Sequence, residues 1–377
     1  MDGIFEFGDS LGPAKVIHIY DHESGLKAIV VVDNVACGPA MGGVRMAPDV
    51  STEEVFRLAR AMTLKNAVAD LPHGGGKAAI LANPKVSAAQ KETLMRAFGV
   101  AIKDMADYIP GPDMGTDEPC MAWVQEETGR AIGLPAAIGG IPLDEVGATG
   151  YGLSVVADVA SDFCHIDLIG AKFVIQGAGS VGLHTAKFLT ARGAVLIGAT
   201  DSQGTVFNPD GIDITQLAKL KGKGKSVIDY VDGQKLARDA VVDIPCDIWI
   251  PAARPDVIRT DNVYRLRTKL IIQGANIPLT TKAEQICHDH NILVIPDFIA
   301  NAGGVICGAV EYGGGTHEIA FQTIEEKIRK NTTVMLETVT RTGKLPRQVA
   351  IEMAEQRIRR ATAYRSKRHG PGLQLIA

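Results

Sequence analysis

Three glycines between a predicted strand and a predicted helix constrain the fold of this 377-residue chain most strongly. The run Gly177-Ala178-Gly179-Ser180-Val181-Gly182 follows the apolar stretch 171–176, and Asp201 ends the next apolar stretch. Glycines at this spacing admit a pyrophosphate to a helix N-terminus, and an acid about 20 residues further on binds a ribose. We therefore expect a Rossmann-type dinucleotide-binding domain rather than a structural glycine turn. Asp201 would repel a 2′-phosphate, which favours NAD, although an arginine elsewhere in the fold would permit NADP.

The rest of the chain divides around this domain. From about residue 169, short apolar stretches alternate with helical ones, as in parallel sheets joined by crossovers. Before that point, residues 15–20 and 26–32 read as a hairpin. We expect an α/β protein with two domains and a cleft between them: an N-terminal substrate-binding and oligomerisation domain at 1–140 and a Rossmann domain at 141–344. A helical segment at 345–377 should pack back on the junction.

Lys77 directly follows three glycines, Gly74-Gly75-Gly76. An isolated run of this kind usually marks a flexible surface turn. Here, however, the helix predicted from Ser51 delivers Lys65 near its C-terminal end, and Asp113 follows further along the chain. We expect a loop in which two cations and a carboxylate meet around a small anion. Such a cluster would depress the lysine pKa values and suit acid–base chemistry.

Composition excludes several classes of function. A net charge of −4 and a pI near 6.2 provide no overall basic field for nucleic acid or an anionic membrane. The six cysteines are scattered without a CxxC pair, and no long apolar run or secretory leader is present. We expect a cytoplasmic protein with no metal site and no nucleic-acid or membrane partner.

Eight blocks of sequence together resemble the glutamate/leucine/phenylalanine/valine dehydrogenases. They occur in the family's order and cover most of the chain, at 38–46, 65–66, 74–77, 112–116, 148–152, 177–182, 274–276 and 301–305. The resemblance implies NAD(P)-dependent interconversion of an L-amino acid with a 2-oxo acid and ammonia. It also implies a homo-oligomer assembled through the first domain.

The resemblance assigns a role to individual residues. Lys65 would hold the substrate α-carboxylate in a pocket that Gly42 and Gly43 line. Lys77 would polarise the carbonyl and the attacking water, and Asp113 would carry protons to and from the amine. Further roles fall to residues near the cofactor: Thr149 at the nicotinamide carboxamide, Asn276 at the nicotinamide ribose, and Asn301 beside cofactor and substrate, unless Asn301 is simply a helix N-cap.

Two positions bear on the choice of substrate. Met41 stands where glutamate-specific members have a lysine, and Gly308 stands where they have a serine. A glutamate side chain buried without those partners would cost several kcal/mol, so we expect large aliphatic or aromatic substrates. The segments 201–204 and 208–211 nevertheless resemble the glutamate branch. His73, where the family usually has an apolar residue, either contacts the substrate or caps a loop.

Three interpretations remain open from the sequence. The first is an NAD-dependent dehydrogenase of apolar L-amino acids. The second is a glutamate dehydrogenase with a rearranged side-chain anchor, and the third is a noncatalytic nucleotide-sensing relative. The presence of Lys65, Lys77 and Asp113 together weakens the third.

Overall fold

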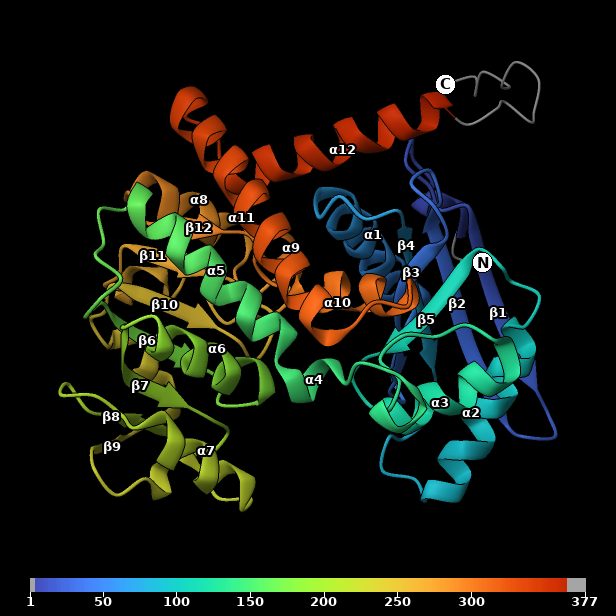
Figure 1. Cartoon of the computed structure of the whole chain (residues 1–377), viewed down its shortest axis with the longest axis horizontal. Helices are drawn as coiled ribbons and strands as arrows, with labels where there is room; N and C mark the ends of the chain where they lie inside the picture. Colours follow the sequence, from blue (N-terminus) through green and yellow to red (C-terminus); the bar gives the residue numbers. More distant parts are fainter. Residues whose placement is uncertain (1–3, 365–377) are drawn as a thin grey trace.

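Two β-sheets, formed by successive parts of the chain, organise the computed structural model, which describes residues 4–364 (Figure 1). The predicted two-domain α/β architecture is confirmed. The first sheet has the order β1-β2-β4-β3-β5. Its strands are β1 (Lys15–Asp21), β2 (Leu26–Asn34), β3 (Ala40–Met46), β4 (Gly74–Ile80) and β5 (Tyr108–Pro112). Its helices are α1 (Thr52–Val68), α2 (Ala88–Ile102) and α3 (Glu118–Thr128).

The second sheet has the order β12-β11-β10-β6-β7-β8-β9. Strands β6 (Lys172–Gln176), β7 (Val195–Thr200), β10 (Ile248–Pro251), β11 (Leu270–Ile272) and β12 (Leu293–Ile295) are parallel, whereas β8 (Thr205–Phe207) and β9 (Gln234–Leu236) pair antiparallel. The chain order reverses beside β6, between β7 on one side and β10 on the other. Dinucleotides bind at such a switch point, outside the carboxyl ends of the strands.

Helices cover the second sheet and complete the molecule. They are α4 (Leu143–Val146), α5 (Ala148–Phe163), α6 (Ser180–Ala191), α7 (Ile214–Gly222), α8 (Thr281–Asp289), α9 (Asp297–Ala300), α10 (Gly303–Tyr312), α11 (His317–Thr342) and α12 (Pro346–Tyr364). The short 3₁₀ turns are η1 (Ile4–Phe7), η2 (Ala136–Ile138), η3 (Val227–Asp229), η4 (Arg238–Asp243) and η5 (Val263–Arg265). None of the helices within residues 4–364 is long and apolar enough to span a bilayer.

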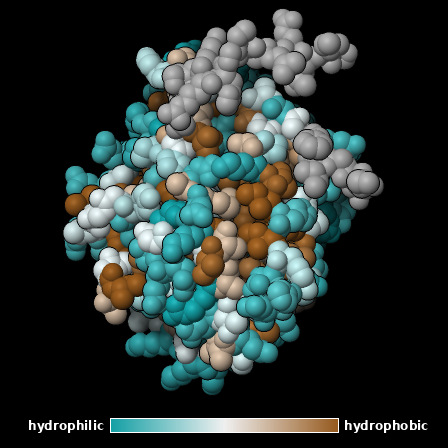
Figure 2. Space-filling model, turned by 90° about the vertical axis from the view of Figure 1, so that its right-hand side faces the viewer, coloured by the Kyte–Doolittle hydropathy of each residue, from teal (hydrophilic) through white to brown (hydrophobic). Residues whose placement is uncertain are grey.

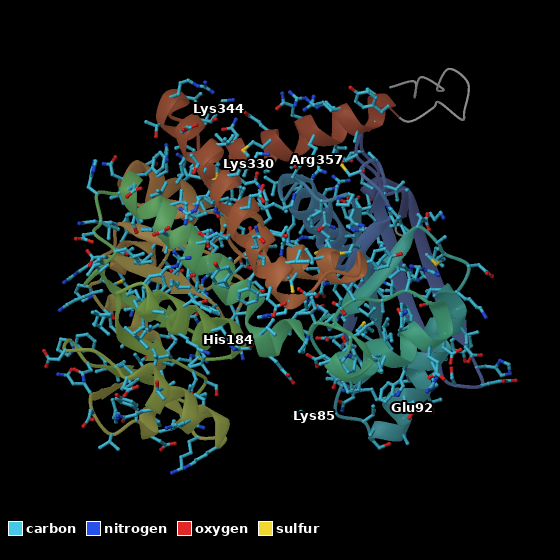
Figure 3. The ribbon with its side chains drawn as sticks, viewed as in Figure 1. Lys85, Glu92, His184, Lys330, Lys344 and Arg357 are labelled. Carbon is cyan, nitrogen blue, oxygen red and sulfur yellow. The ribbon has the colours of Figure 1, made fainter. Side chains whose placement is uncertain are left out.

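Helix α12 returns from the second sheet to the first. Arg357, labelled in Figure 3, donates hydrogen bonds to the carbonyl oxygens of Asn66, Ala67 and Leu71 at the end of α1. At the other end of α12, Arg347 pairs with Glu284 of α8. The helix therefore ties the end of α1 to the second sheet. Residues 365–377, which belong to the predicted C-terminal segment, lie outside the described residues.

One prediction is wrong: the three glycines before Lys77 form no loop. Gly74, Gly75 and Gly76 open strand β4, which is buried along its whole length between β2 and β3. A Cβ on Gly75 would lie 2.0 Å from the backbone nitrogen of Thr63 in α1, and one on Gly76 would lie 3.0 Å from the Tyr108 ring. Close approach of α1 and β5, rather than loop flexibility, explains these glycines.

Candidate functional site

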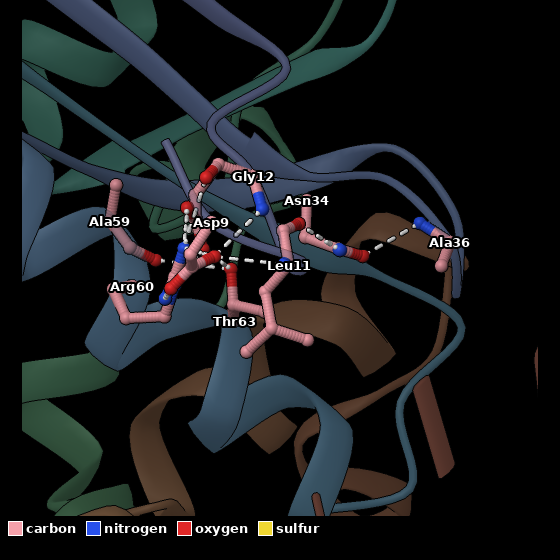
Figure 4. Close-up of polar contacts among 9 residues, drawn as sticks. Asp9, Leu11, Gly12, Asn34, Ala36, Ala59, Arg60 and Thr63 are labelled. Carbon is pink, nitrogen blue, oxygen red and sulfur yellow. Dashed lines mark hydrogen bonds and ion pairs between the residues drawn. The ribbon is translucent and has the colours of Figure 1, made fainter. Parts of the chain in front are cut away.

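Helix α1 brings Lys65 to the site and is anchored at several points. Ser51 caps its N-terminus by accepting a hydrogen bond from the Glu54 backbone, as its sequence predicts. In its middle, Arg60 and Thr63 donate to the fully buried carboxylate of Asp33 on β2. Arg60 also pairs with Asp9 (Figure 4). This network fixes α1 against the first sheet, one turn before Lys65.

Lys77, in the middle of β4, and Asp113, which directly follows β5, form an ion pair across β3, the strand between them. The Lys77 Nζ lies 3.1 Å from Asp113 Oδ1, and the Thr116 hydroxyl accepts a hydrogen bond from the Asp113 backbone. A Cβ on Gly43 would lie 2.8 Å from the Asp113 Cβ and 3.2 Å from Lys77 Nζ. Burial raises the pKa of Asp113, but Lys77 and Arg45 together bring it below its ordinary value.

Lys65, near the end of α1, contacts Asn276, which follows strand β11 of the second sheet. Its Nζ lies 3.4 Å from Asn276 Oδ1, which also accepts from the Asn301 amide. Burial lowers the pKa of Lys65 to about 8; Lys77 acts in the same direction, whereas Asp297 and Asp113 oppose it. Lys65, Lys77 and Asp113 therefore lie in one electrostatic cluster, as predicted.

Asn301 is not a helix N-cap. It is the C-cap of α9, and its side chain donates to the carbonyl oxygen of Gly274 and to Asn276. Its Oδ1 is buried and has no partner among the described residues. Thr149, in the first turn of α5, lies against the start of α10, because a Cβ on Gly304 would be 3.0 Å from its hydroxyl. Asn301 and Thr149 thus lie at the two ends of the short 302–304 segment.

The glycine fingerprint forms the expected turn between β6 and α6. Gly177 has φ +111°, and a Cβ on Gly182 would lie 2.0 Å from its carbonyl oxygen, so α6 packs closely on the turn. Gly179 is the N-cap of α6, and no atom lies within 4 Å of the place a Cβ would take. Ser180 and Val181 form the first turn of α6. This open approach to a helix N-terminus fits a pyrophosphate.

Asp201 differs from the simple expectation for a ribose-binding acid. Its Oδ1 accepts from the Gln203 backbone and the Ser226 hydroxyl, and its Oδ2 accepts from Lys221 Nζ, at 2.7 Å, and the Val227 backbone. Although partial burial opposes it, these contacts lower the pKa of Asp201 to about 2. The four acceptor positions of the carboxylate are filled, and its charge is paired. Repulsion of a 2′-phosphate by a free Asp201 is therefore not supported.

Ile132 lies against both Met41 and Gly308. Met41 and Ile109 are fully buried and pack with Ile132 and Ala309, while a Cβ on Gly308 would lie 2.5 Å from Ile132 Cδ1. We name Met41, Ile109, Ile132, Gly308 and Ala309 the apolar cluster. Every member is uncharged. The Glu311 carboxylate accepts from the backbone N–H groups of Gly133 and Leu134 and so fixes the segment that carries Ile132.

His73 lies beside α10. Its ring meets that of Tyr312 edge to face, with 5.8 Å between centroids. Burial lowers the pKa of His73, and its Nδ1 has no hydrogen-bond partner among the described residues. The two interpretations of His73 stay open.

Sequence reasoning missed three residues of the site. Arg45 donates to Asp113, Ile132 completes the apolar cluster, and Glu311 holds the segment of Ile132. Arg45 lies within the block at 38–46 that carries the family resemblance, but its partner Asp113 is 68 positions away. No group of three His, Cys, Asp or Glu side chains suited to a metal occurs in the described part of the chain.

Two family models match most of the chain. Residues 139–366 match the model of the glutamate/leucine/phenylalanine/valine dehydrogenases, and residues 13–130 match the dimerisation domain of the same family. Glutamate dehydrogenase of Aeropyrum pernix is 38% identical over 322 residues, 80% of this chain and 77% of the relative. NADP-dependent glutamate dehydrogenases are also among the relatives.

Two solved structures share the fold. The hetero-hexameric glutamate dehydrogenase of Thermus thermophilus in its Leu-bound form superposes with a TM-score of 0.84 at 27% identity, covering 93% of this chain and 89% of that one. L-tryptophan dehydrogenase of Nostoc punctiforme gives 0.72 at 25% identity, covering 95% and 99%.

These matches extend over both sheets and identify an oxidoreductase that acts on CH–NH₂ groups. Dehydrogenases of this kind use NAD or NADP. The chain belongs to the glutamate/leucine/phenylalanine/valine dehydrogenase family.

Proposed function

We propose that this enzyme catalyses NAD(P)-dependent oxidative deamination of L-amino acids with large aliphatic or aromatic side chains, and the reverse reductive amination. The observation that carries the proposal is the position of the apolar cluster. It joins β3 and β5 to α10. Lys77 lies on β4, which pairs with β3, and Asp113 directly follows β5. A substrate bound by Lys65 would therefore direct its side chain toward uncharged groups.

The residues divide the chemistry among them. The Lys65 ammonium holds the α-carboxylate of the amino acid, with Gly42 and Gly43 providing room beside it. Lys77 polarises the carbonyl group and the attacking water, and Asp113 accepts and returns the protons of the amine. The nicotinamide supplies the hydride acceptor or donor. Gly177, Gly179, Ser180, Val181 and Gly182 hold its pyrophosphate, and Thr149, Asn276 and Asn301 orient the nicotinamide end.

Several features argue against glutamate as the preferred substrate. A γ-carboxylate that reached Met41 or Gly308 would find no cation in the apolar cluster, and burying it unpaired would cost several kcal/mol. The Glu311 carboxylate, one helical turn after Gly308, would add like-charge repulsion. Against the proposal stand the named glutamate dehydrogenases at 34–39% identity. Because substrate choice depends on the residues at the site rather than on the fold, we give the apolar cluster more weight.

We also propose a cytoplasmic homo-oligomer assembled through the domain at 1–140, with 141–344 binding the cofactor and 345–377 packing on the junction. Support comes from the dimerisation-domain match and from apolar residues gathered near the middle of the molecular face shown in Figure 2, on the side where Figure 1 places the first sheet. Tyr20 and Val100 are 70% and 59% exposed on this domain. Light scattering of the purified protein tests the assembly, and a monomer would contradict it.

Substrate profiling tests the proposed activity. NADH and NADPH formation should be followed with L-leucine, L-phenylalanine, L-tryptophan and L-glutamate. We expect turnover of apolar amino acids and at least about 100-fold lower kcat/KM for glutamate, which corresponds to a difference of roughly 3 kcal/mol. Met41→Lys should raise the relative activity on glutamate. Turnover of glutamate alone, or no turnover of any amino acid, would contradict the proposal.

A further inference from the structure

Arg45 contacts one oxygen of the Asp113 carboxylate, and Lys77 contacts the other. Strand β3 pairs in parallel with β5, with Val44 opposite Pro112, so the residue that follows each lies at the same end of the sheet. Arg45 Nε donates to Asp113 Oδ2 at 2.9 Å, while Lys77 Nζ lies 3.1 Å from Oδ1. The Nη1 of Arg45 donates to Glu54 Oε1 at 2.6 Å. Each carboxylate oxygen of Asp113 therefore has its own cation.

We propose that Arg45, tethered by Glu54, is a positioning residue that holds the Asp113 carboxylate ionised and oriented for proton exchange with the substrate amine. This inference rests on the proposed function, because it assumes that Asp113 moves protons of the substrate amine. It concerns a residue to which the sequence resemblance assigned no role.

The chemistry of arginine suits this task. A guanidinium keeps its charge at every pH a protein meets and donates through a rigid planar group, whereas an ammonium is a rotatable point charge that can lose its proton. Asp113 has a side-chain exposure of 16%. A largely buried carboxylate left without a partner is costly, and Arg45 gives Asp113 a second cationic partner besides Lys77.

The remaining groups around Asp113 do not replace Arg45. Lys77 faces it from β4, Lys65 acts on it from α1, and the phenol of Tyr108 lies near it on β5. Burial, and then Asp113, raise the pKa of Tyr108 well above its ordinary value, so this group stays neutral. Because an ammonium, unlike a guanidinium, can give up its proton, Arg45 is the permanent cation among these neighbours.

Glu54 sets the strength of the effect. It lies in the first turn of α1, its side chain is 43% exposed, and it shares the Arg45 guanidinium with Asp113. Removing the Glu54 charge leaves Arg45 paired with Asp113 alone. The two partners of Arg45 therefore offer substitutions with opposite expected effects on Asp113.

The test compares pH profiles of kcat/KM on the best amino-acid substrate. Arg45→Gln should move the acidic limb upward by about one pH unit, the lower end of the usual effect of an arginine on a neighbouring aspartate. Arg45→Lys should recover most of this shift. Glu54→Gln should move the limb slightly toward lower pH, and Glu53→Gln, on the exposed neighbour, should match the parent protein.

A readout independent of turnover separates this proposal from the proposed function. The protonated Asp113 carbonyl band, taken as the infrared difference between the parent protein and Asp113→Asn, should titrate at higher pH in Arg45→Gln. The role of Arg45 would be overturned if neither the Asp113 carbonyl band nor the acidic limb of the pH profile moved in the Arg45→Gln and Glu54→Gln proteins. If Arg45→Gln does not fold, the Glu54→Gln result decides. Full activity of Asp113→Asn would instead overturn the proposed function.

Discussion

Replacing Gly308 by alanine tests the apolar cluster atom by atom. The added Cβ would lie 2.5 Å from Ile132 Cδ1, about 1 Å inside ordinary contact, while the next atom, Ile132 Cγ1, is 3.5 Å away. Ile132 must therefore shift within the apolar cluster, which we assign to the substrate side chain. Overpacking of this kind costs about 1–3 kcal/mol, which predicts a loss of roughly 5- to 150-fold in kcat/KM for L-leucine, L-phenylalanine and L-tryptophan.

Ile132→Val removes the clashing atom alone. The double variant Gly308→Ala/Ile132→Val should therefore recover the activity to within about 1 kcal/mol, the ordinary cost of an isoleucine-to-valine change. Gly222→Ala is a matched control, because no atom lies within 4 Å of its added Cβ. The assay is NADH formation at several concentrations of each amino acid, with the melting temperature as a check on folding. Our reasoning would be refuted if Gly308→Ala had no effect on large substrates, or if Ile132→Val did not rescue it.

Other predictions follow from the charged residues. Lys77→Ala should lower kcat by orders of magnitude, whereas Lys65→Ala should mainly raise KM for the amino acid; equal modest effects in steady-state kinetics would contradict these separate roles. Because burial lowers the pKa of Lys65 from 10.5 to about 8, the folded protein pays a stability penalty of up to about 3 kcal/mol below pH 8, and this penalty fades as the pH rises to 10.5. Lys65→Met should therefore raise the melting temperature more at pH 7 than at pH 10, and a gain that does not depend on pH would count against this. Lys221 pairs with Asp201, and a paired acid repels a 2′-phosphate weakly, so the kcat/KM values of the parent protein with NAD and NADP should lie within about tenfold of each other. Lys221→Met should lower the ratio of kcat/KM with NADP to kcat/KM with NAD, whereas the control Lys219→Met should leave this ratio unchanged.

Local sequence patterns predicted much of the fold. The alternation of apolar and polar residues located the β1–β2 hairpin, and Ser51 located the start of α1. The spacing of Gly177, Gly179 and Gly182 located the turn before α6. These signals are local: each depends on residues within a few positions of one another, so one sequence is enough to read them.

Contacts between distant segments could not be read in this way. The glycines before Lys77 have the composition of a loop, and only the approach of α1 and Tyr108 to β4 explains why they form a strand. Similarly, Asp201 matched the pattern of a ribose-binding acid, but its partners Lys221, Ser226 and Val227 come from the segment 20 to 26 positions later. Arg45 and Ile132 were missed because β-sheet pairing and helix packing, rather than sequence spacing, bring them to Asp113 and Gly308.

A direct competition tests the central claim, that an apolar cluster lies where the substrate side chain ends. The enzyme would be given equal concentrations of L-leucine, L-phenylalanine, L-tryptophan and L-glutamate with excess NAD and NADP, and the 2-oxo acids would be measured at early times. The ratio of products equals the ratio of kcat/KM values. We predict that products of apolar amino acids exceed 2-oxoglutarate by about 100-fold or more, and a predominance of 2-oxoglutarate would contradict the account.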